Sequence, residues 1–128
     1  MALLVPDAGE KEIATRAWTY EGSKLILYTN NYTPTEGTVI GSLSECAVAG
    51  YAAIALASGS WNITTTTNIT TVTYAQQSFT PTTAVTCYGY GVTNSAKSIL
   101  LYAEYFGSAY TLPAGGGTIN VTLSLTVD

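Results

Sequence analysis

From Thr118 to Asp128, the chain alternates between polar and apolar residues at every position. The apolar set is Ile119, Val121, Leu123, Leu125 and Val127, and the polar set is Thr118, Asn120, Thr122, Ser124 and Thr126. Successive side chains of a β-strand point to opposite faces of the sheet. The alternation therefore predicts a strand with one buried face and one solvated face, which needs a second layer to pack against.

The segment Lys97–Phe106 predicts a second strand, but one that is apolar on both faces. One face carries Ile99, Leu101, Ala103 and Tyr105, and the other carries Leu100, Tyr102 and Phe106. Such a strand is covered on both sides, so we expect it in the centre of a sheet or at a subunit contact. The segment Val85–Val92 is its expected hairpin partner, and residues 93–96 form the turn.

Further strands are expected at residues 24–29 and 51–57 and in the Thr-rich tract 61–75, where Asn68 marks a turn. Residues 30–44 are polar and rich in Gly and Thr, which predicts a long surface loop. Residues 8–18 have helical spacing of apolar side chains, with Asp7 as the expected N-cap. About eight strands and one short N-terminal helix indicate a single all-β domain over residues 1–128, a β-sandwich of jelly-roll-like type.

Charged residues make up 9% of the chain, against about 25% in typical soluble domains. Partners therefore cover part of the surface, or its polarity comes from uncharged Thr, Ser and Asn. The basic residues number four and are scattered along the chain. Nucleic-acid binding and attachment to an anionic membrane both depend on clustered Lys and Arg, so we expect neither.

The chain contains no histidine, which removes the commonest general base and metal ligand. Cys46 and Cys87 have no metal or redox spacing, and we expect two buried thiols rather than a disulfide. Glu104 is the one carboxylate inside an apolar strand, where an edge charge that discourages wrong pairing is the simplest interpretation. We therefore predict no enzyme, no cofactor, no metal site and no small-molecule substrate.

Aromatic side chains make up 11% of the chain. Tyr88, Tyr90, Tyr102, Tyr105 and Tyr110 gather in the C-terminal half. Tyrosine buries a large area at low entropic cost and keeps a polar hydroxyl, so it suits interfaces. Three interpretations stay open for this set: core residues, a protein interface, and rings that stack on sugars.

The first seven residues form a candidate interaction arm, because Leu3, Leu4 and Val5 are apolar and precede Pro6. A frayed terminus is the alternative. The opening lacks the basic region and the long apolar run of a signal peptide, so we expect synthesis in a cytosol.

Several segments together resemble small structural proteins of tailed-phage virions. These segments are VPDAGE, LYTNNYTP, GYAAIAL, YGYGVTN with LLYAEYF, and LPAGGGTINVTLSLT. The resemblance implies a capsid decoration, or cement, protein that bridges capsomers on the outside of the virion. It also implies the major capsid protein as partner, and a homotrimer suits the three-fold sites of a capsid lattice. The alternative is a carbohydrate- or receptor-binding module of a tail fibre.

Overall fold

The computed structural model describes residues 6–19 and 22–127 of this chain, and these residues form two antiparallel sheets and one α-helix. The elements are α1 (Asp7–Thr19), β1 (Ser23–Tyr28), β2 (Ile54–Leu56), β3 (Asn62–Thr66), β4 (Ile69–Phe79), β5 (Val85–Asn94), β6 (Leu100–Leu112) and β7 (Ile119–Val127), with short 3₁₀ turns η1 (Ile40–Ser42) and η2 (Ser58–Ser60). The predicted all-β sandwich with a short N-terminal helix is confirmed. The described residues contain seven strands, against the eight or so expected.

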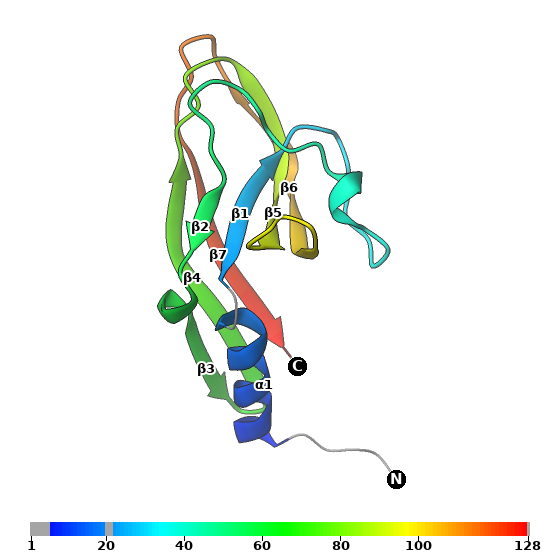
Figure 1. The fold of residues 1–128 in the computed structure, drawn as a ribbon, viewed down its shortest axis with the longest axis vertical. Helices are drawn as coiled ribbons and strands as arrows, with labels where there is room; N and C mark the ends of the chain where they lie inside the picture. The colour runs from blue at the N-terminus through cyan, green and yellow to red at the C-terminus, as the bar shows by residue number, and fades with distance from the viewer. Residues whose placement is uncertain (1–5, 20–21, 128) are drawn as a thin grey trace.

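One sheet has the strand order β2-β1-β5-β6, and the other has the order β3-β4-β7. Every neighbouring pair is antiparallel. The two sheets face each other in the upper part of the view, and β3 with the adjoining part of β4 continues below β1 (Figure 1). The helix α1 packs against β3 and β4, at the end of the sandwich where these strands extend beyond β1 (Figure 1).

The helix begins one residue earlier than expected, so Asp7 is its first residue rather than a cap before it. Of the predicted arm at residues 1–7, Asp7 therefore belongs to α1 and Pro6 is exposed. Leu3, Leu4 and Val5 lie outside the described residues.

The predicted alternation in the last strand is confirmed by burial. Ile119, Val121 and Leu123 of β7 are buried, whereas the intervening Asn120, Thr122 and Ser124 are exposed. The apolar face of β7 joins one core between the sheets, which also includes Leu25, Leu27, Leu56, Val72, Phe79, Cys87, Tyr90 and Val92. The alternation in β7 thus determines which face of its sheet packs against the other sheet.

The Thr-rich tract forms the predicted hairpin. β3 and β4 pair antiparallel from Asn62↔Thr73 to Thr66↔Ile69. Thr67 and Asn68 make the turn with φ of 51° and 64°. Two adjacent residues with positive φ are typical of a two-residue turn whose twist matches that of the flanking strands.

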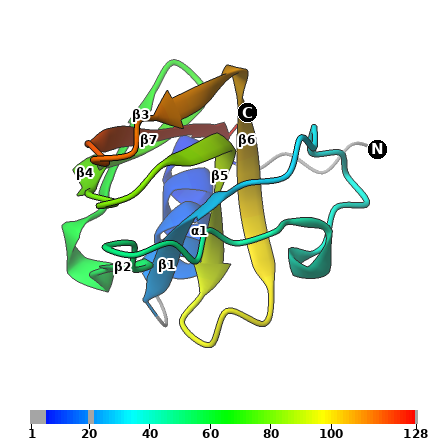
Figure 2. The same ribbon diagram turned by 90° about the horizontal axis from the view of Figure 1, so that it is seen from above.

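The sheet β2-β1-β5-β6 is covered on both faces, which explains the continuous apolar run in β1. Leu25 and Leu27 face the core between the sheets, yet Ile26 and Tyr28 are also fully buried. Residues 30–44 form the predicted loop, which crosses the outer face of this sheet (Figure 2). Leu43 of the loop and Ile26 of β1 both lie 3.4 Å from the position that a Cβ on Gly91 would take.

The strand β6 lies at an edge of its sheet, with β5 on one side and no strand on the other among the described residues. The hairpin of β5 and β6 is confirmed, but β5 runs on to Asn94 and residues 95–99 connect the strands, whereas the sequence places the turn at 93–96 and the next strand from Lys97. A place for β6 at the centre of a sheet is wrong. The strand is apolar on both faces because its inner face meets the core and its outer face meets the loop, not because strands flank it on both sides.

Candidate functional site

The structure divides the predicted tyrosine set between the inside and the outside of the sandwich. Tyr90 is buried in the core. Its ring lies edge-on to the ring of Tyr102, with the ring centroids 6.4 Å apart, and its centroid is 6.1 Å from that of the Phe106 ring. Tyr102 is half-buried against the same core. These two tyrosines mainly hold β6 against its own sandwich.

Tyr88 and Tyr105 lie together outside the core. Their rings stack at 6.5 Å with 24° between the planes, and both are half-buried. The Tyr105 hydroxyl donates to Oδ1 of Asn31 in the loop, at 3.4 Å. Tyr110 is 51% exposed. Tyr110 is thus the member of the predicted set that other molecules can reach most easily.

A β-bulge causes this division. The register of β5 against β6 shifts between Cys87 and Gly89, so Tyr88 falls at the irregularity. Cys87 faces the core before the shift and Tyr90 faces the core after it. Without a shift, residues 87 and 90 would point to opposite faces of the strand.

Glu104 stands on the edge strand, where the sequence interpretation places an edge charge. Its side chain is exposed, and its Oε2 accepts a hydrogen bond of 2.5 Å from the Tyr90 hydroxyl. Burial raises the pKa of Tyr90, and the hydrogen bond and charge of Glu104 raise that pKa further. Tyr90 therefore stays protonated and acts as a hydrogen-bond donor at any physiological pH.

A groove runs between the start of β6 and the tip of the loop. It has a volume of about 530 Å³, and its walls are Pro34, Thr35, Glu36 and Thr38 on one side and Leu100, Leu101, Tyr102 and Ala103 on the other. The tip of the loop lies beyond the edge of β6 in both views (Figure 1, Figure 2). The groove therefore gives access to the edge of the sheet.

Exposed aliphatic side chains lie close to this groove. Leu101 in its wall is 42% exposed, and Ile99 just before β6 is 58% exposed. The alternation of apolar residues in 97–106 did not identify these two as exposed. Leu101 falls at a register shift between the residues paired with Val92 and Thr93, and Ile99 lies in the connection before β6, so neither exposure follows from alternation.

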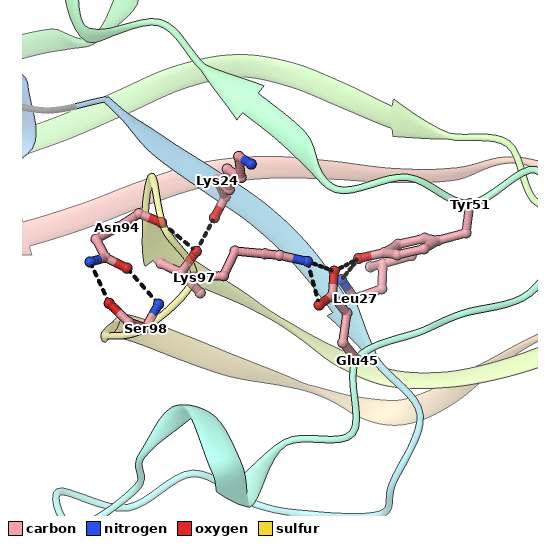
Figure 3. Close-up of polar contacts among 8 residues, drawn as sticks. Lys24, Leu27, Glu45, Tyr51, Asn94, Lys97 and Ser98 are labelled. Carbon is pink, nitrogen blue, oxygen red and sulfur yellow. Dashed lines mark hydrogen bonds and ion pairs between the residues drawn. The ribbon is translucent and has the colours of Figure 1, made fainter.

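A polar cluster links the β5–β6 turn to Glu45, which pairs with the end of β1 (Figure 3). Lys97 pairs with Oε2 of Glu45 at 2.9 Å, and Oε1 of Glu45 accepts from the Tyr51 hydroxyl at 3.1 Å. The Tyr51 hydroxyl in turn accepts from the backbone N–H of Leu27 at 3.3 Å. Burial is the main cause that raises the pKa of Tyr51. Each group has a partner, so the cluster fixes the backbone of three segments.

No protein-family model, curated protein or solved structure matches the chain. Within residues 6–19 and 22–127, no group of three or more His, Cys, Asp or Glu side chains could hold a metal ion. In the same residues, no helix has the length and apolar character needed to cross a membrane.

The two cysteines are free and buried, as the sequence predicts. Burial, with a smaller contribution from the neighbouring Cys46 thiol, raises the pKa of Cys87 to about 12. The thiolate is the reactive form, and the raised pKa keeps Cys87 in the unreactive thiol form at pH 8. We expect an aromatic disulfide reagent at pH 8 to leave the native chain unmodified and to titrate both thiols in denaturant. Prompt reaction of the folded chain would contradict this burial.

Proposed function

We propose that this chain is a non-catalytic structural subunit that packs against other protein chains, as a decoration protein on the outside of a tailed-phage capsid. Its partner in this proposal is the major capsid protein, and its oligomeric form is a homotrimer. The observation that carries the proposal is the exposure of three apolar and aromatic side chains, Ile99 just before β6, Leu101 at its start and Tyr110 near its end. The choice of a capsid as the binding partner comes from the resemblance of the sequence segments to structural proteins of tailed-phage virions.

Composition supports the packing role. Charged residues make up 9% of the chain, so few charged side chains lose their hydration when the surface meets a partner. Interface centres are depleted in charge and enriched in aromatic residues. A chain with this surface loses little by desolvation and gains from each apolar group that it buries.

The architecture also suits a part that resists deformation. The sheet containing β6 is held by the core on one face and by the loop on the other, and the Glu45–Lys97 pair fixes the turn that precedes β6. A rigid surface loses little conformational entropy on binding. When such a contact is repeated at symmetry-related positions of a shell, many modest contacts add to a large stabilisation.

Binding to capsids tests the proposal. We expect the purified chain to raise the rupture temperature of undecorated capsids from the encoding phage. Replacing Tyr110 with serine should weaken binding by about tenfold or more, because an exposed aromatic at an interface typically contributes more than 1 kcal/mol. Ile69 on β4 is 45% exposed and lies in the other sheet, so Ile69→Ser is the matched control.

An unchanged rupture temperature, with no chain on the capsids, would rule out the decoration role. The exposed ring of Tyr110 also suits stacking on a sugar, which is the tail-fibre alternative. A glycan array that binds the native chain but not Tyr110→Ser would favour that alternative. Equal binding of both chains would show that Tyr110 has no part in either role.

A further inference from the structure

The free edge of β6 is protected against pairing along most of its length. Glu104 places a charge on this edge. Between Tyr105 and Tyr110 the register with β5 shifts, and Gly107 there has a φ of 80°. Charges and bulges are devices that keep exposed edges from joining other sheets.

The first four residues of β6, Leu100–Ala103, lack a charged side chain. This uncharged part of the edge is the part that forms one wall of the groove. The other wall, residues 34–38, stands beyond the edge (Figure 2). A whole sheet could not approach past this wall, but a single extended segment could lie between the wall and the strand.

The wall itself is ordered by its own hydrogen bonds. The backbone N–H of Thr35 donates to Oγ1 of Thr38 at 2.7 Å, and the hydroxyls of Tyr32 and Thr38 are 3.3 Å apart. The backbone N–H of Thr38 donates to the carbonyl of Thr35 at 3.0 Å. The groove is therefore formed before anything binds in it, which reduces the entropic cost of binding.

We propose that this groove binds the segment Met1–Val5 of a second copy of the chain as an added strand on β6. The side chains of this segment are apolar and uncharged, which suits the wall of the groove that carries Leu100 and Leu101. Strand addition satisfies the backbone groups at the edge, and alternate side chains supply selectivity.

Length agrees with this assignment. Five extended residues span about 17 Å and four span about 13 Å, so Met1–Val5 can cover the uncharged edge at Leu100–Ala103. In the added strand, Leu3 and Val5 face one side of the sheet and Leu4 faces the other. One copy's arm in the next copy's groove is a head-to-tail contact, and such contacts form a ring, such as the proposed trimer, when the rotation between copies closes.

This inference goes beyond the capsid role, because it concerns contacts between copies of the chain and needs no capsid. Its test uses the full chain with Leu3→Asp and Leu4→Asp, which should leave the groove vacant. We expect a synthetic peptide of residues 1–6 to bind this chain. A third substitution in this chain, Leu101→Asp, should weaken peptide binding by about tenfold or more, because a charge in the groove would then face the apolar side chains of the peptide. Adding Ile69→Asp, the matched control, should leave binding unchanged.

The peptide gives a second check that leaves the protein unaltered. A peptide carrying Asp in place of both leucines should fail to bind. No binding of the native peptide, or equal binding to the Leu101→Asp and Ile69→Asp chains, would overturn the proposal and favour another occupant of the groove.

Sedimentation equilibrium then decides whether the segment in the groove comes from a second copy or from the same chain. The native chain should associate with increasing concentration, and the Leu3→Asp, Leu4→Asp chain should stay monomeric. A native chain that is monomeric at all concentrations would overturn exchange between copies. Failure of capsid binding would leave each of these results unaffected, so the two proposals fail separately.

Discussion

Replacing Gly89 with alanine is expected to lower the free energy of unfolding by about 3 kcal/mol or more. A Cβ at this position would lie 2.1 Å from the backbone oxygen of Glu104 and 2.3 Å from the Tyr28 hydroxyl oxygen. Real contacts of a methyl carbon are far longer, so the backbone of β6 or the ring of Tyr28 must move.

Neither neighbour can move freely. Tyr28 is fully buried, and its hydroxyl donates to the carbonyl of Tyr32 at 3.0 Å. Glu104 belongs to the strand next to Gly89. A shift of either group would disturb the contact between the loop and β6 that forms the groove.

Urea unfolding of Gly89→Ala measures this loss. Gly41→Ala is the control, because a Cβ at Gly41 meets nothing within 4 Å and its φ is not positive. The control should match the native chain within about 0.5 kcal/mol. Equal stability of the two variants would show that Tyr28 does not lie across Gly89.

Replacing Leu123 with alanine should cost about 3–5 kcal/mol, the usual range for a leucine whose loss leaves a cavity. Leu123 is fully buried in the core, on the strand whose alternation predicts the sandwich. Its neighbour Ser124 points outward and is exposed, so Ser124→Ala should change stability by no more than about 0.5 kcal/mol.

The same denaturant titration compares these two adjacent residues. Similar losses for both variants would mean that β7 does not have one buried face and one solvated face. Both substitutions test the sandwich rather than the function, because neither residue belongs to the exposed surface on β6.

The sequence predicts those parts of the fold that depend on local pattern. Alternation identifies β7, and β-branched residues around Asn68 identify the β3–β4 hairpin. The apolar run in β1 predicts a strand, although the pattern alone does not reveal that the loop provides the second cover. These features depend on residues close in sequence, so a single chain is enough to infer them.

The rest depends on contacts between distant residues. A strand that is apolar on both faces can be central or covered by a loop, and only the strand order places β6 at an edge. The division of the tyrosines follows from the register shift at Tyr88, where two steps along β5 correspond to five along β6, because a shift by an odd number of residues exchanges the faces of a strand. The groove joins residues 34–38 to residues 100–103, and no short pattern links them.

Co-sedimentation of the chain with capsids tests most directly whether this surface works by packing against other chains. At rising chain concentration, the amount bound per capsid should reach a plateau at a fixed number of copies, as expected for symmetry-related sites. Bound amounts that stay at the level of a capsid-free control at every concentration would contradict the account.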